Sequence, residues 1–223
     1  IFFLHFPGTL SFREFPRFIT SLTPFLPMNV RRFDTNPIIV PEMDSRMGSN
    51  INGPSLIRVP ASVRSPLGKY YLYFAHHQGT YIRLAYADDL KGPWKIHSPG
   101  VLDLNDSFFM NHIASPDVHV VEETGEIRMY YHGHTRGMPM QFTRVAVSRD
   151  GLHFEARPEV LGTYYWRVFR YGGWWYTLEK PGTIRRSRSG LDAFEEGPVF
   201  FPPSVRHTAV QLRGDALRVF YTS

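Results

Sequence analysis

The feature that most constrains this chain is an internal repeat, because the same order of short segments occurs four times along it. Each copy opens with an apolar segment and passes through a turn into an aromatic segment. In the first three copies a third segment, a turn rich in Asp, Ser or Gly and a short fourth segment follow. The copies begin near residues 53, 115, 165 and 206. This pattern predicts one supersecondary unit that is repeated around a common core.

Each copy has the sequence pattern of short antiparallel strands. In the first copy, Tyr71 and Tyr73 alternate with Leu72 and Phe74, which predicts a strand packed on both faces. No segment shows a sustained helical period. Four short strands joined by tight turns predict an all-β propeller built from four-stranded antiparallel blades. A β-sandwich also contains many short strands, but the recurring order of segments favours the propeller.

Composition excludes several classes of protein and site. The chain has 223 residues, a net charge of +5 and scattered Lys and Arg, so we expect no nucleic-acid partner. It has no Cys, which excludes disulfides and thiolate metal sites. It lacks a stretch of 18 apolar residues, so we expect no membrane-spanning helix and no membrane partner.

The first 27 residues are apolar but contain four prolines, and they lack the basic start and continuous apolar run of a secretory signal. Met28 is followed by a polar segment, which suggests Met28 as the initiator and residues 1–27 as upstream translation; a genuine N-terminal extension is the alternative. We therefore expect an N-terminal extension over residues 1–34, non-native or disordered, and a propeller domain over residues 35–223. A start at Met28 would leave no export signal and predicts a cytoplasmic protein.

The repeats resemble the five-bladed propeller of the family 43 glycoside hydrolases and of their arabinanase, levansucrase and invertase relatives. The resemblance covers roughly residues 35–223 and rests on five motifs: residues 36–39, 52–55, 115–118, 88–94 and 148–154. The last two motifs are outer-strand turns, so they are specific for the fold and say little about activity. The resemblance implies five blades, of which about three and a half are present.

That resemblance also implies three central carboxylates, one at the start of each of the first three blades. Asp117 matches the second, which tunes the pKa and orientation of the others. Asn52 stands where the general base is expected, and residues 164–167, where the general acid is expected, contain no carboxylate. Asn cannot accept a proton at neutral pH, so ordinary hydrolysis by an inverting pair of carboxyl groups is in doubt.

Propeller topology supplies further candidates, because the start of an inner strand and the loop after the second strand lie on the same face. Glu179 is the candidate for a second catalytic carboxylate beside Asp117. The candidates for substrate binding by position are Asn52, His76, His77, His132, Arg167, Arg206 and His207. The arginines could bind a carboxylate or phosphate bidentately, and the histidines could exchange protons. Each of these residues also has a structural alternative as a loop or packing residue, and we expect no metal site and no cofactor.

Two functions remain open on the sequence. The first is a carbohydrate-active propeller with a polar axial funnel, a glycoside hydrolase of altered mechanism. The second is a non-catalytic propeller that binds a saccharide or another small polar ligand. A second usable carboxylate beside Asp117 separates the two hypotheses, and a platform for protein partners fits less well because the candidate axial residues are polar.

The fourth copy ends at Ser223, on what we expect to be its second strand. We therefore expect a C-terminally truncated chain, monomeric when full length. The edge strand at residues 217–221 would then be uncovered, and residues 37–40 would lack the partner that they have in the last blade.

Overall fold

The computed structural model describes residues 2–5, 19–21 and 29–222. This part of the chain consists of β-strands with two 3₁₀ turns, η1 (Pro41–Met43) and η2 (Leu104–Asp106). None of its helices is long and apolar enough to cross a membrane. The chain forms two compact units, residues 31–164 and residues 165–223 together with 1–30. We call them the blade 1–2 unit and the blade 3–4 unit, after the sheets that they contain.

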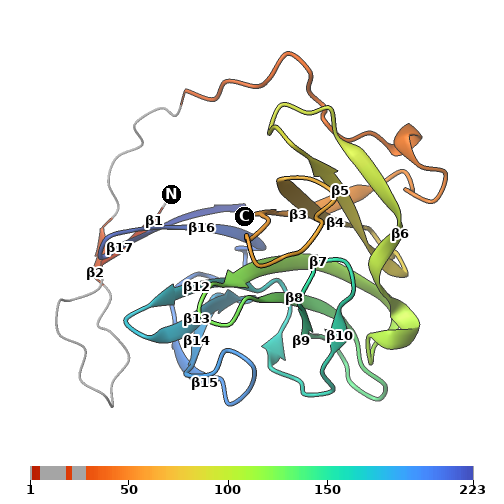
Figure 1. The fold of residues 1–223 in the computed structure, drawn as a ribbon. Helices are drawn as coiled ribbons and strands as arrows, with labels where there is room; N and C mark the ends of the chain where they lie inside the picture. Colours follow the sequence, from red (N-terminus) through yellow and green to blue (C-terminus); the bar gives the residue numbers. More distant parts are fainter. Residues whose placement is uncertain (1, 6–18, 22–28, 223) are drawn as a thin grey trace. The chain divides into compact units, whose positions relative to one another are not determined.

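The blade 1–2 unit contains two antiparallel sheets (Figure 1). Blade 1 has the strand order β3-β4-β5-β6, with β3 (Ile51–Arg58), β4 (Tyr70–His76), β5 (Tyr81–Ala87) and β6 (Lys95–Asp103). Blade 2 has the order β7-β8-β9-β10, with β7 (Met110–Val121), β8 (Glu126–His134), β9 (Gln141–Ser148) and β10 (Glu155–Ala156). The short strand β11 (Gly162–Thr163) also pairs with β9. The predicted four-stranded meander is confirmed in both blades.

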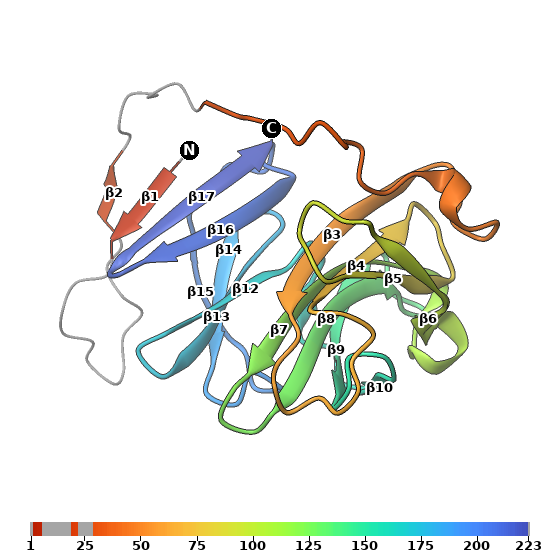
Figure 2. The same cartoon turned by 45° about the horizontal axis from the view of Figure 1, so that its top comes forward.

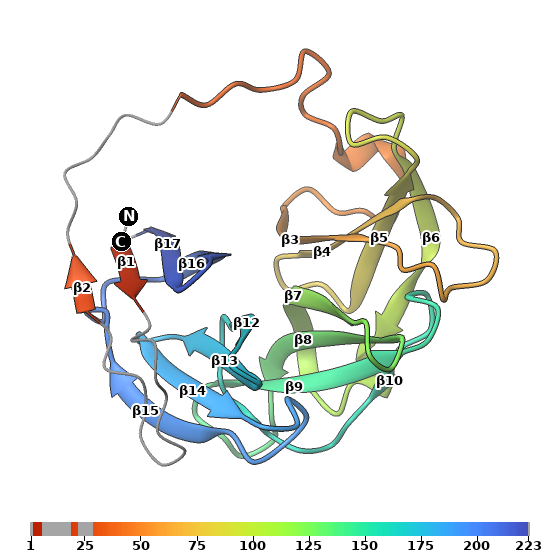
Figure 3. The same ribbon diagram turned by 60° about the vertical axis from the view of Figure 1, so that its left-hand side comes forward.

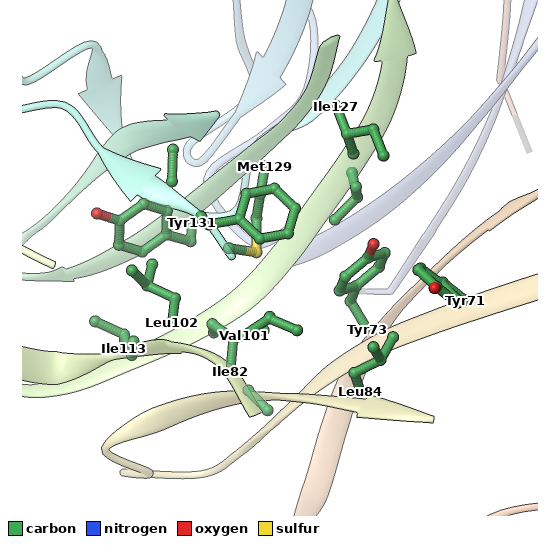
Figure 4. Close-up of a cluster of buried hydrophobic side chains, with 14 of the residues drawn as sticks. Tyr71, Tyr73, Ile82, Leu84, Val101, Leu102, Ile113, Ile127, Met129 and Tyr131 are labelled. Atoms are coloured by element: carbon green, nitrogen blue, oxygen red, sulfur yellow. The ribbon is translucent and has the colours of Figure 1, made fainter. Parts of the chain in front are cut away.

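The core of the blade 1–2 unit confirms the predicted two-sided packing of β4. Tyr71 and Tyr73 belong to a buried cluster shared with blade 2, whereas Phe74 belongs to a second cluster on the other face of blade 1. Figure 4 shows Met129 and Tyr131 of β8 in the cluster that contains the two tyrosines. Truncating such a buried aromatic side chain to alanine costs about 3–5 kcal/mol, so these clusters hold the blades together.

Blade 3 is the antiparallel sheet β12-β13-β14-β15 of the blade 3–4 unit (Figure 3). Its strands are β12 (Arg167–Tyr171), β13 (Trp174–Glu179), β14 (Thr183–Ser187) and β15 (Glu195–Val199). Every residue of β13 is buried, and Phe169 stacks on Tyr176 with ring centroids 5.3 Å apart. Trp174 and Trp175 are buried, as expected for side chains that pack within a blade.

Blade 4 combines the two ends of the chain (Figure 2). The strands β16 (His207–Arg213) and β17 (Ala216–Thr222) form the predicted hairpin. The strand β1 (Phe2–His5) pairs with β17, and β2 (Ile19–Ser21) pairs with β1, so the sheet order is β16-β17-β1-β2. The expectation of an uncovered edge at residues 217–221 is therefore wrong, because backbone groups of β17 pair with residues 2–5.

The remaining expectations for the N-terminal region have separate outcomes. Met28 and most of residues 1–27 lie outside the described residues, so a start at Met28 stays a prediction, as does the boundary at residue 34. The segment at residues 37–40 forms no strand. Ile38 and Ile39 pack against the cluster of Phe74 and Trp94 in blade 1.

Two outer turns, at residues 148–151 of blade 2 and 187–190 of blade 3, have similar sequences and also fold alike. In blade 2, the hydroxyl of Ser148 accepts a hydrogen bond from the backbone N–H of Gly151 at 2.9 Å. In blade 3, the hydroxyl of Ser187 accepts one from the backbone N–H of Gly190 at 3.0 Å. Both glycines have positive φ, near 74° and 71°, a conformation that strains other residues. The recurring turn motif is therefore architectural, as the sequence predicts.

Candidate functional site

Two of the family-like motifs lie side by side in the blade 1–2 unit. A Cβ added at Gly53 would lie 2.9 Å from the Cα of Ser115, so only glycine permits this approach of β3 to β7. The hydroxyl of Ser55 accepts a hydrogen bond from the backbone N–H of Val118 at 2.8 Å. The register of each inner strand also shifts at its motif, in β3 between Asn52 and Ser55 and in β7 just before residue 117. Residues 52–55 and 115–118 therefore form one irregular pair of inner strands.

Asp117 is the eighth residue of β7, which begins at Met110, so the expectation that it starts an inner strand is wrong. Its side chain is largely buried, and one carboxylate oxygen lies 2.9 Å from Nε2 of His119. Residues 117 and 119 share a face because side chains alternate along a strand. Burial raises the pKa of the neighbouring Tyr130 phenol, which keeps that ring neutral. Asp117 therefore has a titratable partner on its own strand.

Asn52 is half-buried and lies opposite Ala75 in the pairing of β3 with β4. Its side-chain amide donates a hydrogen bond to the backbone carbonyl of Asn50 at 3.2 Å. It also lines a largely apolar groove of about 870 Å³, together with Arg32, Asn36, Pro37, Ile38, Ile39, Ile51, Pro54, Leu56, Leu72 and Phe74. An amide in this place can donate and accept hydrogen bonds but cannot serve as a general base.

Histidines gather where β4 and β8 end. His76 is the last residue of β4, and its Nδ1 accepts a hydrogen bond from the backbone N–H of Asn50 at 3.2 Å. His77 follows it and is exposed. His134 ends β8, and its ring lies 5.2 Å from that of His112. Burial, followed by the charges of His134 and His77, lowers the pKa of His112. These rings supply hydrogen-bonding groups where the two strands end.

His132 is buried within β8, opposite Ala114, and its ring lies 6.1 Å from that of Tyr164. The expectation that it comes from a loop is wrong, because β8 extends two residues further. Among residues 2–5, 19–21 and 29–222, no three His, Asp or Glu side chains are grouped as metal ligands would be.

Glu179 ends β13 in the blade 3–4 unit and is buried. One carboxylate oxygen accepts a hydrogen bond from Nε of Arg185 at 2.6 Å, and the other accepts one from Nε1 of Trp166 at 2.9 Å. Arg185 also pairs with the exposed Glu196 at 2.6 Å. Both oxygens of Glu179 thus bind protein donors, and proton transfer to a ligand would require one of these bonds to break.

A cluster of basic side chains lies where the inner strands of the blade 3–4 unit begin. Arg167 starts β12 and His207 starts β16, with Arg206 immediately before it. The ring of His207 packs on that of Tyr165, with centroids 4.4 Å apart. This packing removes water and lowers the pKa of His207, and the charges of Arg206, Arg167 and Lys180 lower it further.

The candidate residues thus belong to two different units. Asn52, Asp117 and three of the histidines belong to the blade 1–2 unit, and Arg167, Glu179, Arg206 and His207 belong to the blade 3–4 unit. Their convergence on one axis stays a prediction. Sequence reasoning missed His119, although its spacing from Asp117 on a strand was a usable signal. It also missed Arg185, whose pairing with Glu179 depends on strand register.

No family model matches the chain. An uncharacterised protein of Acanthamoeba polyphaga mimivirus is 34% identical over 196 residues, which are 75% of this chain and 53% of that protein. The chain therefore spans about half the length of the curated relative that it matches.

Solved structures of glycoside hydrolases resemble the chain more distantly. An α-L-arabinofuranosidase of Clostridium thermocellum has a TM-score of 0.58 and 18% identity, over 78% of this chain and 62% of that one. An exo-β-1,3-galactanase of Phanerochaete chrysosporium, solved with galactose, has a TM-score of 0.60 and 10% identity, over 78% and 44%. The likeness shows the fold. This chain has a partial β-propeller fold, which these solved structures share.

Proposed function

We propose that this protein is a carbohydrate-active propeller and that the present chain binds a saccharide without the usual hydrolytic pair of carboxylates. The observation that carries the proposal is the pairing of residues 52–55 with residues 115–118, which places Asn52 and Asp117 on adjacent inner strands. An amide and a carboxylate on neighbouring strands offer the donors and acceptors that sugar hydroxyls require.

The fold supports the same class of ligand. The galactanase that shares this fold is solved with galactose, and the arabinofuranosidase acts on another sugar. Fold alone does not specify function, so the argument depends on the polar residues that β3 and β7 place together. The half-buried Asn52 and the largely buried Asp117 are carried by the paired strands β3 and β7, which gives a rigid platform for a ligand.

Binding is favoured over hydrolysis by the state of the carboxylates. Asn52 occupies the position of the general base and cannot accept a proton at neutral pH. Glu179, the candidate for a second catalytic carboxylate, is held by Arg185 and Trp166. Asp117 remains as a carboxylate that can orient a sugar hydroxyl, with His119 beside it.

Calorimetric titration of the purified chain with neutral oligosaccharides tests the proposal. We expect saturable binding to at least one of xylotetraose, arabinotetraose and galactotetraose, and we expect Asp117→Asn to weaken it about tenfold, since a charge-assisted hydrogen bond becomes a neutral one. Asp106→Asn is the matched control because it makes the same change at an exposed position. Absence of binding to all three sugars contradicts the proposal.

The hydrolase alternative is tested in the same samples by the release of reducing ends. We expect no turnover from the chain. Turnover that Asp117→Asn abolishes and Asp106→Asn leaves intact would establish a glycoside hydrolase and would contradict the binding-only assignment. Turnover that Asp117→Asn leaves unchanged would remove Asp117 from the mechanism.

A further inference from the structure

The blade 3–4 unit carries a surface that the proposed saccharide site does not explain. Arg167, Lys180, Arg206 and His207 are near one another, because the charges of the other three all act on the imidazole of His207. Lys180 and Arg206 also line the same small hollow of about 10 Å³, together with Tyr165 and Thr208. We refer to Arg167, Lys180, Arg206 and His207 as the basic cluster.

The backbone explains why the members of the basic cluster meet. Arg167 lies opposite Leu178 in the pairing of β12 with β13, and Lys180 follows two residues after Leu178. The backbone N–H of Arg206 bonds to the carbonyl of Thr222 at 2.9 Å, which fixes the start of β16. The ring of His207 rests on Tyr165, two residues before Arg167. Regular strand pairing therefore holds these cationic side chains at one end of the unit.

One acidic side chain, Glu179, lies beside the basic cluster. Glu179 lines the same hollow, but its two oxygens bind Arg185 and Trp166. Among residues 2–5, 19–21 and 29–222, the Arg206 side chain has no hydrogen-bond or ion-pair partner, and it is exposed. Arg167 donates to the carbonyl of Trp166 at 2.8 Å, which uses one of the five N–H donors of a guanidinium. Positive charges held together in this way repel one another until an anion binds between them.

We propose that the basic cluster binds an acidic saccharide through a planar or tetrahedral oxyanion such as a uronate carboxylate or a sulfate ester. Guanidinium groups bind both shapes through paired N–H donors, which a neutral hydroxyl cannot match. The rings of Tyr165 and His207, tilted by 51° to one another with centroids 4.4 Å apart, add an aromatic surface beside the cations that a sugar ring can contact. The inference rests on the proposed saccharide function and narrows it to acidic sugars.

The test compares four probes of similar size on the full chain by calorimetry: xylotetraose, tetragalacturonic acid, a sulfated galactose tetrasaccharide and a single-stranded tetranucleotide. We expect at least one of the two acidic saccharides to bind about tenfold more tightly than xylotetraose, and the advantage to shrink as salt rises. The tetranucleotide should bind no better than xylotetraose. The two acidic arms identify whether a carboxylate or a sulfate ester is preferred.

Single substitutions of arginine test whether the basic cluster causes the tighter binding of acidic saccharides. Arg206→Gln and Arg167→Gln should each weaken binding of the acidic saccharide about tenfold and leave binding of the neutral one within about twofold. Arg213→Gln is the matched control, since Arg213 is exposed at the opposite end of β16 and loses the same charge. Arg206 is exposed, so its variant is expected to fold, and an unchanged circular dichroism melt verifies this.

The outcomes are separable. Binding of neutral sugar with no acidic preference would overturn the inference and leave the proposed function in place. Equal losses in Arg206→Gln and Arg213→Gln, or tight binding of the tetranucleotide, would also overturn it, because a general attraction for polyanions would then suffice. Binding of none of the saccharides would overturn both proposals.

Discussion

The two units use the same blade topology to present different chemistry where their inner strands begin. The blade 1–2 unit places His76, His132 and His134 at the ends of β4 and β8, and it places Asp117 on β7. The blade 3–4 unit places arginines at the starts of β12 and β16. The first set offers imidazole and carboxylate hydrogen-bonding groups, whereas the guanidinium groups of the second stay positively charged. The repeat therefore determines the positions of the strand-end residues, whereas the residue types at those positions differ between the two units.

The two candidate carboxylates also differ in the side chains that they bind. Asp117 lies beside His119, whose ring carries a charge only when protonated. Glu179 lies beside Arg185, which is always charged, and it also binds Trp166. The two carboxylates therefore have different electrostatic surroundings, with a histidine beside Asp117 and a permanent positive charge beside Glu179.

The largest expected effect is on stability and separates these two carboxylates. Glu179→Gln should destabilise the protein by about 3 kcal/mol, because it removes the charged partner of the largely buried Arg185. Asp117→Asn should cost about 1 kcal/mol, since His119 can remain neutral. Urea unfolding of each variant measures the difference. Glu196→Gln is the control, because its exposed ion pair with Arg185 contributes under about 1 kcal/mol. Equal costs at positions 117 and 179 would contradict this difference between the two carboxylates.

A smaller effect distinguishes the outer turns of blades 2 and 3. The charged carboxylate of Asp150 accepts hydrogen bonds from the backbone N–H groups of Leu152 and His153, at 2.8 and 2.9 Å. In blade 3 the neutral hydroxyl of Ser189 accepts them from Leu191 and Asp192, at 3.0 and 3.2 Å. Asp150→Ala should therefore cost about 1–2 kcal/mol, and Ser189→Ala about 0.5–1 kcal/mol. Thermal melts at pH 7 rank the two variants, and the reverse order would contradict the account of the turns.

The same two turns should differ in their response to acid. Burial would raise the pKa of Asp150, but hydrogen bonds from His153, Leu152 and Ser148 outweigh it and lower the pKa to about 2. The stability that this carboxylate contributes is present above its unfolded pKa of 3.8 and is lost as the pH falls toward about 2. The difference in stability between the wild type and Asp150→Asn should narrow over that range. The difference between the wild type and Ser189→Ala should stay constant, and narrowing in both would contradict the prediction.

The smallest effect concerns His207 in the basic cluster. Packing on Tyr165 and the nearby positive charges lower the pKa of His207 below its usual 6.5. The unfolded chain then binds the proton more readily, so stability is full above about pH 6.5 and declines as the pH falls through the folded pKa. His207→Gln should make the melting temperature vary less between pH 7.5 and 5. If His207→Gln leaves the dependence of the melting temperature on pH unchanged, the claim that neighbouring positive charges lower the pKa of His207 is contradicted.

The sequence predicts the fold well and the site only in part. Alternation at residues 71–74 and the recurring turns at residues 148–151 and 187–190 are local signals, so they specify blades without knowledge of the rest of the chain. The pairing of β1 with β17 joins segments from opposite ends of the chain, and no local pattern marks it. The contact of Glu179 with Arg185 depends on the register between β13 and β14, which cannot be read from the amino-acid sequence alone. The spacing of Asp117 and His119 is the exception, because strand alternation alone places them together.

The most direct test of the account is hydrogen exchange of the purified chain with and without saturating saccharide, read peptide by peptide. Binding at the paired inner strands predicts slower exchange in residues 50–58 and 110–121, which contain Asn52 and Asp117. Exchange in the turn at residues 148–156 should not change. That turn follows β9, which is separated from β7 by β8 in the sheet. Protection confined to that turn, or absent from both inner strands under saturating ligand, would contradict the claim that β3 and β7 carry the saccharide site.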